Sequence, residues 1–130
     1  MSTHSFIGYE TETGSVVGVY CHYDGYLDGV GYMLKKHYID PAKIKALVEL
    51  GSLSSLGAQL GEKHAFDEVV GDEKEWTTAY HRDRGEELAI AEYDDMYSIS
   101  GTYQFMYVYM NQSQWMYKND SANSPWLPLI

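Results

Sequence analysis

The chain has 130 residues, 45% of them hydrophobic, so it is long and apolar enough to bury one core and is not disordered. Nine basic and nineteen acidic residues leave a net charge of −10, which disfavours direct binding to nucleic acid and favours a basic partner. With one cysteine, no apolar run long enough to span a bilayer and no signal-peptide pattern, we expect a cytoplasmic protein without disulfides or membrane contact.

The first third of the sequence predicts a β-hairpin followed by a helix. Residues 5–10 and 15–23 are rich in β-branched and aromatic residues, and Gly14 between them can supply a positive φ. Neither face of residues 15–23 is purely polar, so we expect this strand at the centre of its sheet. A helix is expected over about residues 29–38, with Asp28 as its N-cap.

A second helix has clearer boundary signals. Asp40 is expected as its N-cap, Pro41 as its first residue and Gly51 as the residue that ends it. Apolar residues recur at helical spacing between these positions. Residues 53–60 contain three leucines at helical spacing and predict a short third helical segment.

The second half of the sequence predicts an acidic connection and a second pair of strands. Residues 67–95 hold eleven acidic and three basic residues and are expected to form loop and short helix. Aromatic residues alternate from 98 to 108, and residues 115–117 return after a turn. We therefore expect one α+β domain over residues 1–118, followed by an extended tail over 119–130. Its N-terminal β-hairpin, two to three helices and C-terminal antiparallel aromatic-rich strands would form one sheet.

Two His-x-Asp pairs are the first candidates for chemistry. His22 and Asp24 end the second predicted strand, and His81 and Asp83 lie in the segment YHRDRGEE. If the pairs faced each other, they could bind Zn²⁺ or Mn²⁺ in a hydrolase, or act as general acid and base. The alternative is that each histidine bonds a nearby carbonyl and that Asp24-Gly25 is only a turn. No cofactor motif occurs, and we expect no cofactor.

The stretch YCHYDGYLDGVG, residues 20–31, is expected to be the corner between a strand and a helix. Its glycines would allow the backbone to turn, with a positive φ at Gly25. His22 and Tyr26 would then lie near a helix N-terminus, where backbone N–H groups favour an anion. The corner can thus be structural in its glycines and functional in its side chains.

Two arginines inside the acidic region need partners of opposite charge. Arg82 and Arg84 either pair with neighbouring carboxylates such as Glu86, or hold the phosphate of a small nucleotide whose base stacks on tyrosine. The thirteen tyrosines of the chain suit such a binding surface.

The segments YCHYDGYLDGVGYMLKKHY, LGSLSSLG and YHRDRGEEL resemble a family of small uncharacterised proteins from bacteriophages and prophages. Members of that family share a Tyr-Cys-His-(Trp/Tyr)-Asp-Gly-Tyr motif. The resemblance implies no particular reaction. A phage setting implies an accessory protein that acts in the cytoplasm of the host bacterium.

These observations together predict a non-catalytic phage protein that binds and modulates or inhibits a host factor, for example in counter-defence. Its partner would present a basic surface to the acidic side chains of Glu73, Glu75, Glu86 and Glu87. The alternatives are a metal-dependent hydrolase and a protein that sequesters a small anionic nucleotide, and the chain could act as a homodimer. The expected ligand- or partner-binding residues are His22, Asp24, Tyr26, His81, Arg82, Asp83, Arg84 and Glu86.

Overall fold

The computed structural model describes residues 3–66, 76–101, 103–111, 114–119 and 125–129. The strands in these residues are β1 (Ser5–Glu10), β2 (Val16–Cys21), β3 (Leu53–Ser55), β4 (Thr78–Ala79), β5 (Ala91–Tyr93), β6 (Phe105–Met110), β7 (Gln114–Asn119) and β8 (Leu127–Pro128). The helices are α1 (Tyr32–His37), α2 (Pro41–Glu49) and α3 (Tyr80–Arg84), with a π-helical turn η1 (Leu27–Gly31) and a 3-10 turn η2 (Met96–Ser98).

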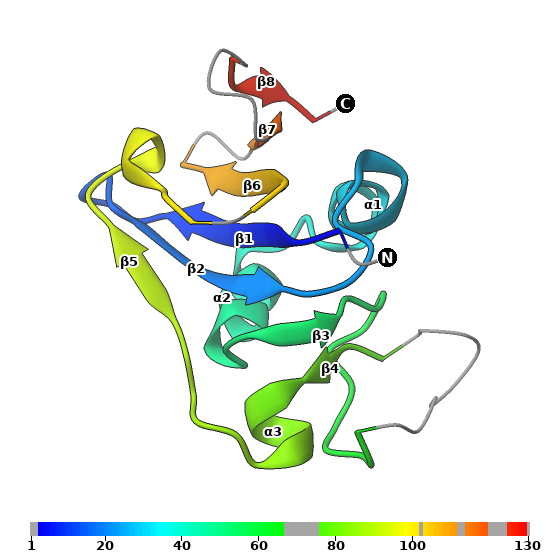
Figure 1. Cartoon of the computed structure of the whole chain (residues 1–130). Helices are drawn as coiled ribbons and strands as arrows, with labels where there is room; N and C mark the ends of the chain where they lie inside the picture. Colours follow the sequence, from blue (N-terminus) through cyan, green and yellow to red (C-terminus); the bar gives the residue numbers. More distant parts are fainter. Residues whose placement is uncertain (1–2, 67–75, 102, 112–113, 120–124, 130) are drawn as a thin grey trace.

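The described strands form one mixed sheet, in the order β4-β3-β2-β1-β6-β7-β8, and β5 joins it beside β2 (Figure 1). Helices α1 and α2 supply the larger core on one face of this sheet. The predicted α+β class is therefore confirmed. None of the helices in the described part of the chain is long and apolar enough to cross a bilayer.

The predicted N-terminal hairpin is confirmed. β1 and β2 pair antiparallel in a register that places Gly8 opposite Gly18, and Gly14 in the connecting turn has a φ of +89°. The paired glycines make room for the ring of Phe6, because a Cβ on Gly8 would lie 2.8 Å from a ring carbon. Phe6 can therefore be fully buried against the two strands.

β2 is a central strand, as the apolar character of both its faces predicts. β1 pairs along one edge, while β3 near Cys21 and β5 near Val16 share the other edge. Val19 and Cys21 contribute to the helix-side core, whereas Val16 belongs to a smaller core on the opposite face. That smaller core is completed by side chains from residues 91–103, so both faces of β2 are covered.

α2 confirms the boundary signals read from its sequence. The side chain of Asp40 accepts a hydrogen bond from the Ala42 N–H at 3.0 Å, and Pro41 is the first helical residue. Gly51 follows the helix with a φ of +80°. The side chains that α2 buries in the core are Ile44, Leu47 and Val48.

The first helix differs from the span predicted for residues 29–38. The chain makes the π-helical turn η1 before α1, and α1 ends at His37. The prediction that Asp28 caps the helix is wrong: the residue before η1 is Tyr26, and no side chain bonds to the helix start. Helical structure already begins at Leu27, so Asp28 lies inside the first turn rather than ahead of it.

The third helical segment predicted for residues 53–60 is also wrong, because the chain forms β3 there. The backbone N–H groups of His22 and Tyr23 donate to the carbonyls of Leu53 and Ser54 at 2.9 and 3.0 Å. A neighbouring strand thus satisfies the backbone in extended form. This tertiary pairing outweighs the helical spacing of the leucines.

The C-terminal strands are antiparallel and rich in aromatic residues, as predicted. β6 pairs with β7, and Tyr107 lies in the helix-side core while Val108 lies in the smaller core on the opposite face. The strand starts only at Phe105, because η2 and bends occupy the earlier part of the predicted span. Within the predicted tail, β8 pairs with β7.

A parallel pairing of β1 with β6 joins the N-terminal and C-terminal strands into one sheet.

The acidic connection predicted over residues 67–95 is described only in part: residues 67–75, and with them Glu73 and Glu75, lie outside the described residues. Its described remainder contains β4, α3 and β5.

Candidate functional site

The backbone of the predicted corner turns at Asp24 rather than at Gly25. Asp24 has a φ of +60°, so the expected positive φ is displaced by one residue, onto an aspartate, which tolerates this conformation. Gly25 is needed for a different reason. A Cβ at Gly25 would lie 2.7 Å from the carbonyl oxygen of Thr3, so only glycine permits this close approach.

The turn that follows is fixed to the rest of the protein by backbone hydrogen bonds. The Val30 N–H donates to the Asp24 carbonyl at 2.8 Å, and the hydroxyl of buried Tyr107 donates to the Gly25 carbonyl at 2.7 Å. A Cβ on Gly29 would clash with the Asp24 carbonyl oxygen. The corner is therefore a rigid element whose conformation is determined by contacts from Thr3 and from Tyr107 of β6 as well as by its own residues.

Four large apolar side chains of the corner and of the first residue of α1 are exposed. Tyr23 is 47% exposed, Tyr26 44%, Leu27 38% and Tyr32 44%. These four, the corner patch, are among only nine large apolar side chains that are exposed in the described residues. Such a concentration of exposed aromatic surface on a rigid backbone is typical of a binding surface.

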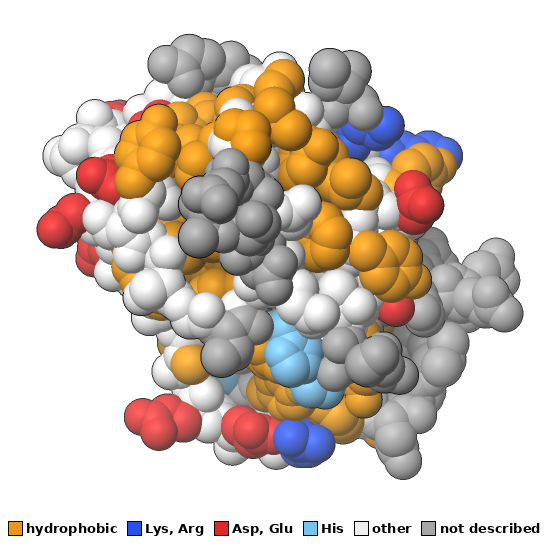
Figure 2. Space-filling view, turned by 45° about the horizontal axis from the view of Figure 1, so that its top comes forward, with side chains coloured by type: hydrophobic (Ala, Val, Ile, Leu, Met, Phe, Trp, Pro, Cys, Tyr) orange, Lys and Arg blue, Asp and Glu red, His pale blue; other side chains and the backbone are white. Residues whose placement is uncertain are grey.

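A half-buried cluster of histidine and tyrosine adjoins the corner patch. The imidazole rings of His4 and His22 stack with their centroids 4.8 Å apart, and the Tyr20 hydroxyl lies 2.5 Å from Nδ1 of His22. Burial raises the pKa of Tyr20, so its hydroxyl stays protonated at neutral pH. Figure 2 shows histidine side chains lying among hydrophobic ones on one face of the molecule. The stacking on His4 and the hydrogen bond with Tyr20 thus hold the ring of His22 on two sides.

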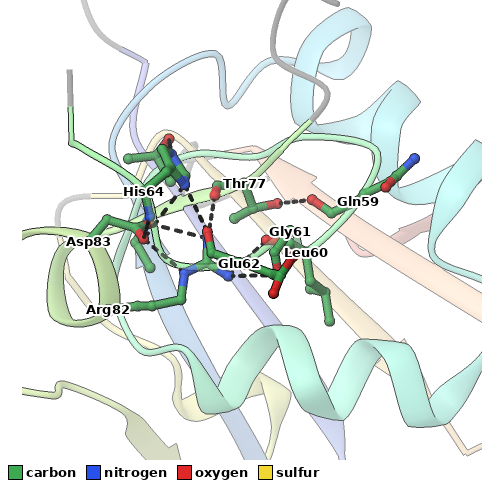
Figure 3. A network of polar contacts seen from close by, with 10 residues as sticks. Gln59, Leu60, Gly61, Glu62, His64, Thr77, Arg82 and Asp83 are labelled. Carbon is green, nitrogen blue, oxygen red and sulfur yellow. Dashed lines mark hydrogen bonds and ion pairs between the residues drawn. The ribbon is translucent and has the colours of Figure 1, made fainter. Parts of the chain in front are cut away.

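Arg82 is the centre of a polar network that fastens the loop after β3 to α3 (Figure 3). Its guanidinium donates to the carbonyls of Leu60 at 2.8 Å and Thr77 at 2.6 Å, and it pairs with the carboxylate of Asp83 at 2.9 Å. Every nitrogen of the guanidinium has an acceptor within the fold. This arrangement matches the alternative in which the arginine pairs inside the acidic region.

Asp83 is the buried anion of the same network. Its carboxylate accepts hydrogen bonds from the backbone N–H groups of Ala79 at 2.8 Å and His64 at 3.2 Å. Burial alone would raise the pKa of this carboxyl, but the hydrogen bonds from Arg82, Ala79 and His64 outweigh it and lower the pKa below its usual range. Asp83 therefore remains charged and serves the fold. We call Arg82, Asp83 and the groups bonded to them the Arg82 clamp.

The other predicted residues of this segment are exposed and bonded locally. Nδ1 of His81 lies 2.7 Å from the Glu86 carbonyl oxygen. The Arg84 guanidinium pairs with the Glu86 carboxylate, and it lies over the ring of Phe66 at 4.2 Å. Cation–π contact and ion pairing together place Arg84 against the protein surface.

The structure does not assemble the two His-x-Asp pairs into a metal centre. Within the described residues, no group of three or more His, Cys, Asp or Glu side chains is arranged to hold a metal ion. Asp83 is committed to the Arg82 clamp, and Tyr26 donates to the Asp24 carboxylate at 3.3 Å. The hydrolase alternative consequently has no geometric support.

Cys21 offers no nucleophile to the candidate site. It is fully buried, and that burial raises the pKa of its thiol to about 12. The thiol therefore stays protonated at neutral pH, and nucleophilic chemistry requires the thiolate.

The sequence predicted Tyr26 as a binding residue, but not its neighbours in the corner patch. Tyr23, Leu27 and Tyr32 were not among the residues expected to bind a ligand or partner. A sequence signal for an exposed apolar surface was present, since the ten residues 23–32 contain these four large apolar side chains and three glycines. The acceptors of Arg82, by contrast, are backbone carbonyls, which no residue type reveals.

No protein-family model, no curated protein and no solved structure matches this chain.

Proposed function

We propose that this chain is a non-catalytic binding protein that engages a partner protein through the corner patch. The observation that carries the proposal is the exposure of Tyr23, Tyr26, Leu27 and Tyr32 on one rigid corner. Tyrosine provides a large contact area with few rotatable bonds, so binding through it costs little side-chain entropy. A backbone held by Gly25, Gly29 and the Tyr107 hydroxyl lowers the ordering cost further.

The charge of the chain supports a partner with a basic surface. Asp24 and Asp28 lie between the tyrosines of the corner patch, and the whole chain carries a net charge of −10. Carboxylates around an aromatic centre raise the association rate with a basic partner and discriminate against acidic ones. The resemblance to phage proteins favours a host factor in the bacterial cytoplasm as that partner, which the protein would modulate or inhibit.

Nucleotide sequestration has less support as a function. That hypothesis gives the phosphate to Arg82 or Arg84, but Arg82 donates all its hydrogen bonds within the fold and Arg84 pairs with Glu86. The described pocket nearest the candidate residues is small, about 180 Å³, and is lined by Asp24 and Asp28. Two carboxylates at its wall would repel an anionic ligand.

The proposal is tested by removing the aromatic surface without touching the core. Wild-type protein and the variant Tyr23→Ala/Tyr26→Ala/Tyr32→Ala are immobilised and exposed to lysate of a bacterial host, and captured proteins are quantified by mass spectrometry. Tyr97→Ala is the matched control, because Tyr97 is 79% exposed and lies outside the patch. We expect one or a few proteins that the wild type and the control capture and the triple variant loses. Equal capture by all three proteins would refute the proposal, provided that the triple variant keeps the wild-type circular dichroism spectrum.

A further inference from the structure

Four neighbouring surface hollows follow one another along the helix side of the sheet. The largest has a volume of about 510 Å³ and lies between the β1–β2 turn, the start of α2 and the β6–β7 turn. The last lies at the corner, where Asp24 and Tyr26 line it. We call this run of hollows the edge groove. Each hollow shares two lining residues with the next: Pro41 and Tyr109, then Lys35 and Leu129, then Asp28 and Tyr32.

The edge groove exists because the helices cover only part of the sheet. α2 packs on β1 and β2, while β6, β7 and β8 extend the sheet on the far side of β1 (Figure 1). Tyr109 of β6 and Tyr117 of β7 belong to the helix-side face there, and both line the groove. The aromatic alternation of the C-terminal strands thus supplies one buried tyrosine, Tyr107, and two that border a surface hollow.

Carboxylates lie at both ends of the edge groove. Glu10 and Glu12 line its first hollow, and Asp24 and Asp28 line its last. Glu10 also accepts a hydrogen bond from the Asn111 N–H at 3.0 Å, whereas Glu12 and Asp28 are exposed. The basic side chains that line the groove are Lys45 in the first hollow and Lys35 in the two middle ones.

From this geometry we propose that the edge groove binds an extended segment of a partner protein that carries basic side chains toward both its ends. A series of open hollows fits an extended chain, whose alternate side chains can enter successive hollows, better than it fits one compact small molecule. The acidic ends supply the charge complementarity, and the tyrosines supply apolar contact. The inference rests on the proposed function, because Tyr26, Leu27 and Tyr32 of the corner patch also line the last two hollows.

The test uses a displayed library of random peptides of about twelve residues, which span roughly 40 Å when extended. Peptides are selected on the intact wild-type chain, and their affinities are then measured for two charge-reversal variants. Glu12→Lys/Asp28→Lys reverses one exposed carboxylate at each end of the groove. Glu49→Lys/Glu92→Lys reverses two exposed carboxylates that do not line it and changes the net charge equally.

We expect selected peptides to be enriched in Lys and Arg. They should lose about tenfold or more in affinity for Glu12→Lys/Asp28→Lys and change little for the control variant. Amide signals of Tyr109 and Tyr117 should shift when the peptide is added. Failure to enrich any sequence, or equal affinity for both variants, would overturn the inference. So would a wild-type homodimer that Glu12→Lys/Asp28→Lys dissociates, because a second copy would then occupy the groove.

The proposed function and this inference fail in different ways. Tyr23 belongs to the corner patch but does not line the groove. If Tyr23→Ala weakens capture of the host protein while Glu12→Lys/Asp28→Lys leaves it intact, the groove is excluded and the binding function stands. If neither Glu12→Lys/Asp28→Lys nor the triple tyrosine variant affects capture, the binding function itself is refuted.

Discussion

The segments around His22 and His81 share a His-x-Asp pattern but have different backbone conformations. His22 directly follows β2, its ring stacks on His4, and the side chain of Tyr23 beside it is 47% exposed. In α3, by contrast, residues two apart point in nearly opposite directions, so His81 is exposed while Asp83 is buried. The same pattern therefore belongs to an exposed surface at His22 and to the buried Arg82 clamp at Asp83. The difference shows that i, i+2 pairs have meaning only once the element is known.

The largest effect should come from breaking the Arg82 clamp. Asp83→Ala leaves the guanidinium of Arg82, whose side chain is only 16% exposed, without its counter-ion. Loss of one member of a buried pair typically costs about 3–5 kcal/mol of unfolding free energy. Urea denaturation measures this loss of unfolding free energy. Arg84→Ala is the matched control, because it breaks an exposed pair at the end of the same helix and should cost about 1 kcal/mol or less. Similar costs for the two variants would mean that the clamp is no more structural than the surface pair.

The rigidity of the corner is tested at Gly29. A methyl group there would clash with the backbone carbonyl of Asp24, so Gly29→Ala should destabilise the protein by about 1–3 kcal/mol. Gly85→Ala is the comparison. Gly85 has a φ of +74° with open space around it, and the substitution should cost only about 1 kcal/mol. A neutral Gly29→Ala would show that the corner adapts and is not preorganised.

Acid should weaken the Arg82 clamp. The pKa of Asp83 is lower in the folded state than its ordinary value of 3.8, because hydrogen bonds to its carboxylate outweigh its burial. Its contribution is therefore present in full at neutral pH and is lost as the pH falls from about 5 toward 2. Protonation keeps the size of the side chain, so the effect should be smaller than that of Asp83→Ala. Over this pH range, the unfolding free energy from denaturation curves should fall more steeply with pH for the wild type than for Asp83→Asn.

The smallest effect is expected at Asp28. Because its side chain makes no cap and is exposed, Asp28→Ala should change the unfolding free energy by less than about 0.5 kcal/mol. Asp40→Ala is the matched variant, since it removes a real N-cap and should cost about 0.5–2 kcal/mol. Equal losses at the two positions would restore Asp28 as a cap.

Local signals were sufficient for the hairpin and for α2. Gly14, Asp40, Pro41 and Gly51 each act through their own backbone or one close neighbour, so their roles can be read from the sequence. The corner could be predicted only as a corner. Its conformation depends on Thr3 and on a tyrosine 82 positions away, which no local pattern includes.

The candidate site shows the same division. Tyr26 was predicted because it lies next to the expected start of a helix, and pairing of Arg82 with neighbouring carboxylates was one of two alternatives. Which alternative holds depends on the carbonyls of Leu60 and Thr77, which the tertiary fold brings to the guanidinium. The edge groove could not be predicted, because it results from how far the sheet extends beyond its helices.

The parallel pairing of β1 with β6 has a consequence for synthesis on the ribosome. β1 is translated early, but its second hydrogen-bonding edge stays open until residues 105–110 have left the exit tunnel. During that interval the N-terminal hairpin exposes an apolar strand edge, the type of edge at which chains aggregate. A nascent chain arrested before β6 should therefore bind chaperones strongly, and release should coincide with the appearance of β6 and β7.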